Sequence, residues 1–311
     1  MSGEQRYRLM RELGSGSFGV VYLGYDNQTN NYVAIKRVEK IGDFVSREYE
    51  ILSKIKDSPF CISLLDFFYT NNVHGQLIQN MVFEYFTTNL ESVLTLRRQG
   101  NRPFEEEVLK NYTYSLLCAL AEIHAKGITH RDLKPENILI RDDAIKLADF
   151  GSSKILVPGK KNTPYIVSRY YRAPELLLCC TDYDFKIDIW AAGCIIAEMC
   201  HLEPVFVGSE DGEQLFSILD ILGNFSTSDA EHYIERTDFN SGFFQKIPKY
   251  KPRKKVIESW FSKFSCKKEL LALVKGMLEL NPENRITAEE ALKSPLFDCF
   301  RPSRSRKRSF L

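Results

Sequence analysis

The pattern of apolar and polar residues changes once along the sequence, and that change limits the folds that the chain can adopt. Residues 7 to 38 alternate apolar and polar positions in short segments broken by Gly and Asn, which is typical of antiparallel strands joined by tight turns. Residues 44 to 55 have apolar positions close to the helical period, and a strand-like pattern then returns until about residue 84. Beyond about residue 88 the pattern is mostly helical. The sequence therefore predicts an α+β fold with two lobes: a small antiparallel β-sheet lobe with one helix, and a larger, mainly helical lobe.

The predicted lobe boundaries lie where the strand-like pattern gives way to the helical pattern. No internal repeat or long linker separates the lobes, so we expect a short hinge at 84–88 between a small lobe at 7–83 and a large lobe at 89–300. Residues 1–6 are expected to form an N-terminal extension. Residues 301–311 form a basic, Ser-rich tail, which we interpret as a solvated terminus, with a weak nuclear targeting signal as the alternative.

Charge and composition exclude several classes of function. Basic and acidic residues number 42 and 41, a net charge of +1, whereas proteins that bind nucleic acid or membranes usually carry a strong basic excess. The chain has no apolar run of about 18 residues and no signal peptide at its start. Its eight cysteines form no C-x-x-C pair and are expected to stay reduced. We therefore expect a cytoplasmic monomer, with the nucleus as the alternative location, that binds neither nucleic acid nor membranes.

The first candidate site is a glycine-rich loop. Gly14, Gly16 and Gly19 form a G-x-G-x-x-G pattern, in which backbone N–H groups can approach phosphates that a side chain would block. The same spacing opens dinucleotide-binding units, but there a helix follows the third glycine. Here the strand-like residues 20–25 follow, which disfavours that alternative.

A lysine on the next predicted strand is the second candidate. Lys36 is preceded by three apolar residues, Val33, Ala34 and Ile35, which indicates that it is not an ordinary solvated charge. Its ammonium group could reach the phosphates of a nucleotide. Glu48, on the following predicted helix, offers a carboxylate that could hold Lys36 in place.

A more specific cluster of polar residues lies in the second lobe. Asp132, Lys134 and Asn137 fall within six residues between apolar segments, and Asp149 follows twelve residues after Asn137. Separately, each could be a loop cap or a turn residue, but the joint spacing disfavours that explanation. His130 is expected to be a loop histidine bonded to the backbone rather than a metal ligand.

Taken together, these motifs resemble a eukaryotic protein kinase. The order of glycine-rich loop, V-A-I-K lysine, helix glutamate, H-R-D-L-x-x-x-N, D-F-G and A-P-E matches that family from residue 7 to about residue 300. The resemblance implies the bilobal kinase fold, the cofactors ATP and Mg²⁺, and phosphoryl transfer to Ser or Thr of protein substrates. In such enzymes Asp132 would accept the proton of the attacking hydroxyl and Lys134 would stabilise charge on the moving group. Lys36, held by Glu48, would orient the α and β phosphates.

The resemblance also assigns the nucleotide and metal contacts. Asn137 and Asp149 would hold Mg²⁺ through hard oxygen ligands. Backbone groups at Glu84 and Phe86 would bind adenine, with Phe83 at the rear of the pocket. The implied nucleotide-binding positions are Gly14, Gly16, Gly19, Val21, Ala34, Lys36, Glu84, Phe86, Asn137 and Asp149. A pseudokinase scaffold that binds nucleotide without turnover is the non-enzyme alternative, which the intact motifs disfavour.

Two supporting contacts are implied as well. Asp188 should tie down the backbone of the loop that carries Asp132. Arg285 should form a buried ion pair with Glu175 that supports the large lobe, and removing either partner should strand a buried charge.

The segment S-R-Y-Y-R-A-P-E-L-L narrows the resemblance to the CMGC group of Ser/Thr kinases, most of all to the glycogen synthase kinase-3 (shaggy) family. In this group Arg172 would bond the carbonyl of Val167, which a substrate amide would otherwise use. Proline has no amide hydrogen and loses nothing there, so proline after the target residue is an expected preference. Three cations, Arg47, Arg131 and Lys154, would form a phosphate pocket.

Two hypotheses differ in whose phosphate enters that pocket. In glycogen synthase kinases it is a phosphate already on the substrate, four residues after the target, and the loop tyrosine of that family is matched by Tyr165. In mitogen-activated kinases the loop's own phosphothreonine enters, and Thr163 with Tyr165 matches their T-x-Y motif. Thr163 and Tyr165 are both expected to be regulatory phosphorylation sites. Cyclin dependence is disfavoured by residues 39–52, and divergence at residues 224–266 leaves regulatory and scaffold partners unassigned.

Overall fold

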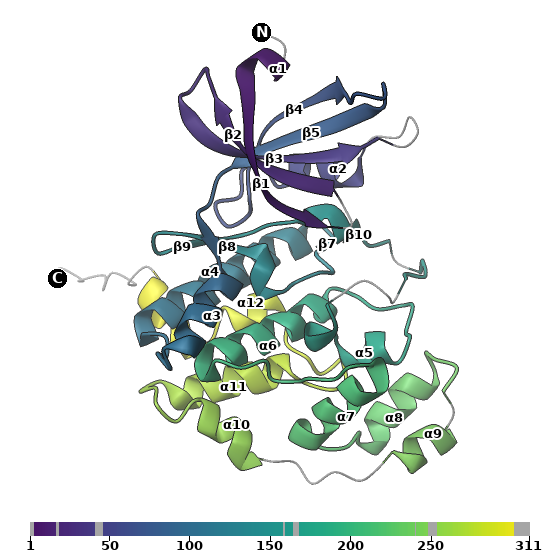
Figure 1. Cartoon of the computed structure of the whole chain (residues 1–311). Helices are drawn as coiled ribbons and strands as arrows, with labels where there is room; N and C mark the ends of the chain where they lie inside the picture. The colour runs from purple at the N-terminus through teal and green to yellow at the C-terminus, as the bar shows by residue number, and fades with distance from the viewer. Residues whose placement is uncertain are drawn as a thin grey trace, which may run out of the picture.

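The chain folds into two lobes stacked one above the other (Figure 1). The structure, a computed structural model, describes residues 3–16, 19–40, 46–157, 159–163, 168–239, 241–247 and 254–301. The larger sheet lies in the N-terminal lobe, and the long helices lie in the C-terminal lobe, which confirms the predicted bilobal α+β fold. None of the helices in the described ranges has the length and apolar character needed to cross a bilayer.

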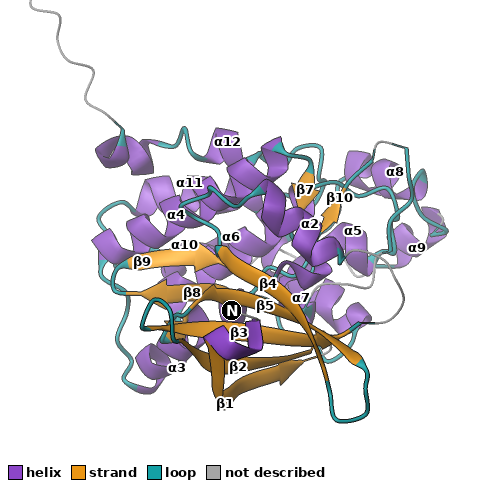
Figure 2. Ribbon diagram, turned by 90° about the horizontal axis from the view of Figure 1, so that it is seen from above, coloured by secondary structure: helices purple, strands orange, loops and turns teal. Residues whose placement is uncertain are grey.

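The small lobe is built on one antiparallel sheet with the strand order β1-β2-β3-β5-β4, which twists when seen from above (Figure 2). One face buries Val33, Ile35 and Val82, so the apolar alternation of the sequence becomes one packed face. The strands are β1 (Tyr7–Gly16), β2 (Gly19–Asp26), β3 (Asn31–Glu39), β4 (Leu64–Asn71) and β5 (Leu77–Glu84).

Helix α2 (Arg47–Lys54) is the helix predicted beside this sheet. It buries Ile51 and Leu52, and its Tyr49 ring lies 4.5 Å from the ring of Phe67 on β4. The predicted helix began at residue 44, and residues 41–45 lie outside the described residues. A short helix, α1 (Gly3–Arg6), falls within the segment predicted as an extension.

The large lobe is organised around helix α6 (Lys186–His201), which buries every residue from Ile187 to Cys200. A helix that is apolar on all sides belongs in a core, and α4 and α11 pack against it. The remaining helices are α3 (Leu90–Gln99), α4 (Glu106–Ala125), α5 (Pro174–Leu177), α7 (Asp211–Leu222), α8 (Thr227–Ile234), α9 (Ser241–Lys246), α10 (Lys254–Trp260), α11 (Lys267–Met277) and α12 (Ala288–Ala291).

Short strands in the large lobe were not predicted from the sequence. Hairpin β8–β9 connects the loop that carries Asp132 to the segment that carries Asp149, and β7 pairs with β10. These strands are β6 (Thr88–Asn89), β7 (Ile128–Thr129), β8 (Ile138–Arg141), β9 (Ala144–Leu147) and β10 (Lys154–Ile155). Short 3-10 helices lie at η1 (Pro135–Asn137), η2 (Phe150–Ser152), η3 (Arg169–Tyr171) and η4 (Pro295–Phe300).

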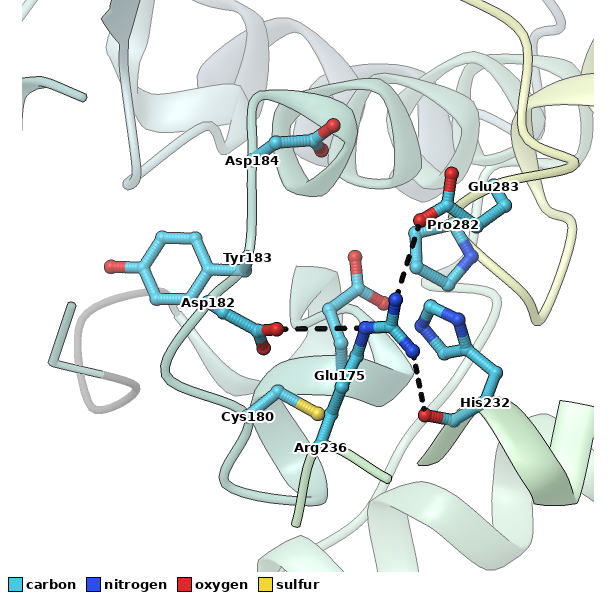
Figure 3. A pocket seen from close by; sticks show the side chains of 9 residues that line it. All are labelled: Glu175, Cys180, Asp182, Tyr183, Asp184, His232, Arg236, Pro282 and Glu283. Atoms are coloured by element: carbon cyan, nitrogen blue, oxygen red, sulfur yellow. Dashed lines mark hydrogen bonds and ion pairs between the residues drawn. The ribbon is translucent and has the colours of Figure 1, made fainter. Parts of the chain in front are cut away.

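A small hollow lined by Glu175 of α5, His232 of α8 and Glu283 is crossed by the guanidinium of Arg236 (Figure 3). Arg236 lies 3.5 Å from Asp182 and 4.0 Å from Glu283, and it donates to the carbonyl of His232 at 3.2 Å. These contacts connect the turn after α8 to two other segments of the large lobe. The hollow is therefore a cross-braced part of the scaffold.

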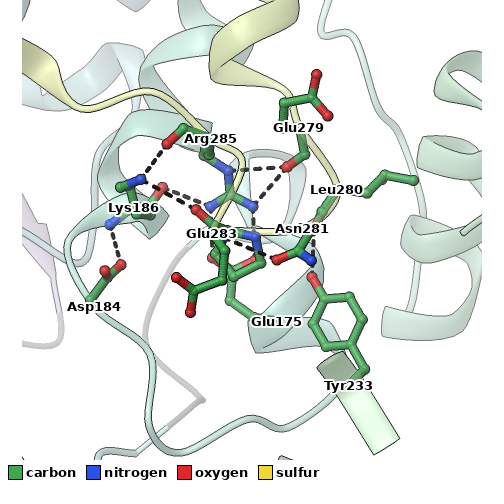
Figure 4. A network of polar contacts seen from close by, with 10 residues as sticks. Glu175, Asp184, Lys186, Tyr233, Glu279, Leu280, Asn281, Glu283 and Arg285 are labelled. Carbon is green, nitrogen blue, oxygen red and sulfur yellow. Dashed lines mark hydrogen bonds and ion pairs between the residues drawn. The ribbon is translucent and has the colours of Figure 1, made fainter. Parts of the chain in front are cut away.

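The predicted ion pair between Arg285 and Glu175 is confirmed (Figure 4). Its two bonds measure 2.7 and 3.0 Å, and both side chains are almost fully buried. Arg285 also donates to the carbonyls of Glu279 and Lys186. Because Glu175 belongs to α5, this network anchors the segment that follows Arg172 to the C-terminal helices.

Candidate active site

A cleft of about 710 Å³ lies between the lobes, a size usual for small-molecule sites. Its wall comes from the β1–β2 hairpin, β3, α2, the end of β5 and the loops around β8 and β9. Every position that the resemblance assigned to the nucleotide lines this cleft: Gly14, Gly16, Gly19, Val21, Ala34, Lys36, Glu84, Phe86, Asn137 and Asp149. Glu48, Phe83, Asp132 and Lys134 line it as well.

The glycines of the β1–β2 hairpin serve two purposes. A Cβ on Gly19 would lie 2.4 Å from the carbonyl oxygen of Arg37, and the φ of Gly19 is +118°, so the backbone itself requires glycine there. A Cβ on Gly14 or Gly16 would meet no atom within 4 Å. Since packing does not demand these two glycines, they leave open space where a phosphate could approach the backbone, which fits a nucleotide.

Lys36 forms a cluster with two carboxylates, here called the lysine cluster: Lys36, Glu48 and Asp149. Its ammonium nitrogen lies 2.8 and 2.9 Å from the two carboxylate oxygens of Glu48 and 2.9 Å from Oδ1 of Asp149. Burial opposes the charged form of Lys36, but the two carboxylates outweigh it and hold the pKa of Lys36 above its usual value. The pair that was predicted between Lys36 and Glu48 is thus formed, and it draws α2 toward the cleft.

The loop around Asp132 brings three predicted residues together. The Asn137 side-chain N–H donates to the carbonyl of Asp132 at 2.8 Å, and the ammonium of Lys134 lies 3.1 Å from Oδ2 of Asp132. This bond uses the amide nitrogen of Asn137 and leaves its oxygen as a ligand. That oxygen and the carboxylate of Asp149 are hard donors, and Mg²⁺ usually takes few protein ligands and completes its shell with water and phosphate oxygens.

Ser168 is a site residue that the sequence analysis missed. Its backbone N–H and its hydroxyl both donate to Oδ1 of Asp132, at 3.3 Å each. Together with Lys134 on the other carboxylate oxygen, Ser168 fixes the orientation of Asp132. The signal in the sequence was only a hydroxyl residue before Arg169, in a loop already rich in hydroxyls.

Asp188 holds the backbone of the same loop, as predicted. Its carboxylate accepts the N–H of His130 at 2.8 Å and the N–H of Arg131 at 2.9 Å, and it lies 3.0 Å from Nε2 of His124. Arg131 has a φ of +67°, a strained conformation for a residue with a side chain. His130 is confirmed as a loop histidine, since its Nε2 lies 2.9 Å from the carbonyl oxygen of Ala148.

The hinge carries an unpredicted set of side-chain contacts. The carboxylate of Glu84 accepts the N–H of Ser63 at 3.1 Å and pairs with Arg141 at 3.3 Å and with Lys146. The guanidinium of Arg141 lies over the ring of Phe86 at 4.6 Å. The hinge backbone is therefore tied to β8 and β9, which holds it in a fixed place.

Comparison with known proteins agrees with this geometry. The family model described as a protein kinase domain matches residues 7–297. The chain belongs to the protein kinase family. It is 38% identical over 301 residues to "Protein kinase gsk3" of Schizosaccharomyces pombe, which covers 95% of this chain and 75% of that relative.

Two further relatives indicate which class of protein kinase the chain resembles. The chain is 36% identical to "Probable serine/threonine-protein kinase MRK1 homolog" of Encephalitozoon cuniculi, over 94% of this chain and 87% of the relative. It is 42% identical to "Probable serine/threonine-protein kinase glkA" of Dictyostelium discoideum, over 78% of this chain, and there it spans about half (51%) of the relative's length. This kinase is thus a Ser/Thr protein kinase similar to the glycogen synthase kinase-3 family, as the sequence predicted.

The structure brings together the three cations that were predicted to form a phosphate pocket, Arg47, Arg131 and Lys154. Arg131 is buried and donates to the carbonyl of Ser152 at 2.8 Å, whereas Arg47 is exposed at the start of α2. Burial and the charges of Arg131 and Arg47 lower the pKa of Lys154, so both arginines lie close enough to act on its ammonium group. Within the described residues, none of the three forms an ion pair with a carboxylate.

The loop beyond the pocket is described only in part. Thr163 is exposed, and its carbonyl accepts the hydroxyl of Tyr183 at 2.9 Å. Tyr165 and Val167, predicted as a phosphosite and as part of the substrate pocket, lie outside the described residues. Arg172 is buried, and its Nη1 donates to Asp211, a partner that the sequence did not reveal.

Proposed function

We propose that this kinase transfers the γ-phosphoryl group of Mg-ATP to Ser or Thr of protein substrates that already carry a phosphate four residues after the target, with proline after the target favoured. One observation supports the proposal: Arg131 and Arg47 lie close enough to Lys154 to lower its pKa, and within the described residues none of the three cations pairs with a carboxylate. A dianionic phosphate would relieve the repulsion that Arg47 and Arg131 exert on Lys154.

The catalytic steps follow from the contacts in the cleft. Bound Mg²⁺ would neutralise phosphate charge. Asp132, oriented by Ser168 and Lys134, would accept the proton of the substrate hydroxyl. Lys36, held charged by the lysine cluster, supports positioning of the nucleotide phosphates. The chain's own residues thereby supply orientation and fixed charge, which is most of what phosphoryl transfer needs.

A second occupant of the pocket is supported by the position of Thr163. The Nη1 of Arg131 donates to the hydroxyl of Tyr183 at 3.2 Å, and that hydroxyl donates to the carbonyl of Thr163. Lys154 bonds the side chain of Asn162 at 2.6 Å, next to Thr163 in the chain. A phosphate on Thr163 would therefore start close to the pocket, as the activation-by-loop-phosphorylation hypothesis requires.

A peptide experiment separates the two occupants. Turnover is measured on a Ser-Pro peptide with and without phosphoserine four residues after the target, using wild type and Thr163→Val, with the phosphorylation state of the loop read by mass spectrometry. We expect priming to raise kcat/KM at least about tenfold, in wild type and in Thr163→Val alike. Activity that requires phosphorylated Thr163 and ignores priming would favour the alternative.

Two variants test the pocket itself. Lys154→Ala should abolish the gain from priming while leaving turnover of the unprimed peptide unchanged. Lys161→Ala removes an exposed positive charge from the same loop, and should keep the gain. If both variants respond to priming as wild type does, the phosphate enters elsewhere and the proposal fails.

A further inference from the structure

One guanidinium of the large lobe contacts the hinge between the lobes. Nη2 of Arg141 donates to the carboxylate of Glu84 at 3.3 Å, and its Nη1 donates to the carbonyl of Tyr85 at 3.4 Å. The same guanidinium lies 4.6 Å from the centre of the Phe86 ring. Arg141 therefore contacts three consecutive hinge residues. Those three residues line the cleft, whereas Arg141 lies outside its wall.

These contacts act on a part of the hinge that lies between two paired strands. Glu84 is the last residue of β5 that pairs with β3, and the chain next pairs at Thr88, in β6. Tyr85 and Phe86 lie between these two paired segments. The carboxylate of Glu84 also pairs with Lys146, so Glu84 keeps a partner without the guanidinium. We therefore expect loss of the guanidinium to act mainly at Tyr85 and Phe86.

Arg141 is itself held in a fixed place. It is the last residue of β8 and pairs with Ala144 of β9, so a tight turn joins the two strands. The side-chain N–H of Asn111, on α4, donates to the carbonyl of Asp143 in that turn at 2.7 Å. The hairpin is thereby fixed to a long helix of the large lobe. A planar guanidinium carried on a fixed hairpin can hold an aromatic ring in one orientation.

We propose that Arg141 is a positioning residue for the nucleotide, which raises the affinity of the cleft for adenine by holding the hinge backbone. The inference rests on the proposed function, in which Mg-ATP is the phosphoryl donor, and on the role that the resemblance implies for backbone groups at Glu84 and Phe86. Hydrogen bonds to adenine need donors and acceptors at fixed positions. Because Arg141 holds this backbone before the nucleotide arrives, binding does not have to order it.

A purely structural role for Arg141 predicts a different result. General loss of stability would weaken every ligand and lower kcat together. Since the Arg141 side chain is 49% exposed, we expect its removal to change the free energy of unfolding little. A positioning role predicts weaker binding at the adenine end of the cleft alone. A ligand that has adenine but no phosphate therefore isolates the effect.

The experiment measures the dissociation constants of Mg-ADP and of adenosine by calorimetry, for wild type, Arg141→Ala, Arg141→Lys and Arg102→Ala. We expect Arg141→Ala to weaken both ligands about fivefold, because both carry adenine. In turnover, KM for ATP should rise by a similar factor while kcat and KM for the peptide stay unchanged. Arg141→Lys keeps the charge without the planar fork and should recover only part of the affinity. Arg102→Ala removes an exposed arginine after α3, outside the wall of the cleft, and should bind both ligands as wild type does.

The outcomes separate this inference from the function beneath it. Wild-type affinity for both ligands in Arg141→Ala overturns the role of Arg141 and leaves the proposed function standing. Weaker Mg-ADP with unchanged adenosine also overturns it, because the effect would then lie at the phosphates. So does an equal loss in Arg102→Ala, or a loss in Arg141→Ala that comes with a lower melting temperature and a lower kcat. Wild type that binds neither ligand and does not turn over Mg-ATP overturns both the inference and the proposed function.

Discussion

The lysine cluster and the phosphate pocket both gather positive charge, but they balance it in opposite ways. Lys36 meets two carboxylates within 2.9 Å, so its charge is satisfied inside the chain. Arg131 and Lys154 meet a carbonyl, a hydroxyl and an amide oxygen instead, and the neighbouring cations lower the pKa of Lys154. Charge that is balanced internally fixes a structure, whereas charge left in excess marks where an external anion can bind.

The largest expected effect comes from removing the central charge of the lysine cluster. Lys36→Met should lower Mg-ATP turnover by about 1,000-fold or more, because Glu48 and Asp149 lose the ammonium that positions them and the phosphates. Lys56→Met, at an exposed position after α2, is the matched control and should retain activity. Turnover that persists in Lys36→Met would show that the cluster is structural only. Nucleotide binding without turnover in wild type would favour the pseudokinase alternative.

The buried ion pair between Arg285 and Glu175 extends the comparison to the free energy of unfolding. Glu175→Gln leaves Arg285 charged and without its carboxylate in a site where the arginine side chain is 0% exposed. We expect the free energy of unfolding to fall by about 3 to 5 kcal/mol, measured by urea denaturation. Glu283→Gln removes a carboxylate that is 71% exposed and should cost under about 1 kcal/mol. Similar losses in the two variants would mean that burial does not decide the cost.

Glu198 allows the effect of burial on a charged group to be tested through the pH dependence of stability. Burial raises its pKa to about 7 although Tyr171 donates to it at 2.8 Å and Arg98 lies 3.2 Å away. Because the folded state holds the proton more tightly than the unfolded chain, this stabilisation is present below about pH 4.5 and is lost as pH rises through about 7. Relative to Glu198→Gln, wild type should therefore lose up to about 3 kcal/mol of unfolding free energy between pH 4.5 and 8. Parallel pH profiles for the two proteins would contradict the raised pKa.

The sequence predicted local patterns and the distant partners that the family motifs supply, such as Arg285 with Glu175, but not distant partners outside those motifs. The helical region that contains α6 was predictable because its sequence is strongly apolar, as expected of a helix whose central residues are all buried. The lysine cluster was predictable because its members belong to motifs with fixed spacing. Asp211 lies 39 residues from Arg172, and Lys146 lies 62 residues from Glu84, so no periodicity links either pair. Such pairs form only when the lobes and loops are packed.

The short strands were missed for a different reason. Segments such as β7, with two residues, are too short to show alternation, and they form because neighbouring loops bring their backbones together. The strand pattern predicted between residue 55 and about residue 84 includes Cys61, yet β4 begins at Leu64, and Cys61 instead bridges to Leu147 in the large lobe. Tertiary contacts overrode the local preference there.

The smallest expected effect concerns the phosphate pocket in the absence of substrate. If Arg47, Arg131 and Lys154 repel one another, inorganic phosphate should raise the melting temperature of wild type, by about 2 to 4 °C at concentrations well above its dissociation constant. Lys154→Ala should lose most of that shift, and without phosphate it should be at least as stable as wild type because one repelling charge is gone. Lys161→Ala should keep the shift, since Lys161 is an exposed charge of the same loop that does not bear on the pKa of Lys154. An equal shift in all three proteins would place the phosphate outside the pocket, and the contrast between balanced and excess charge would then no longer point to an anion site.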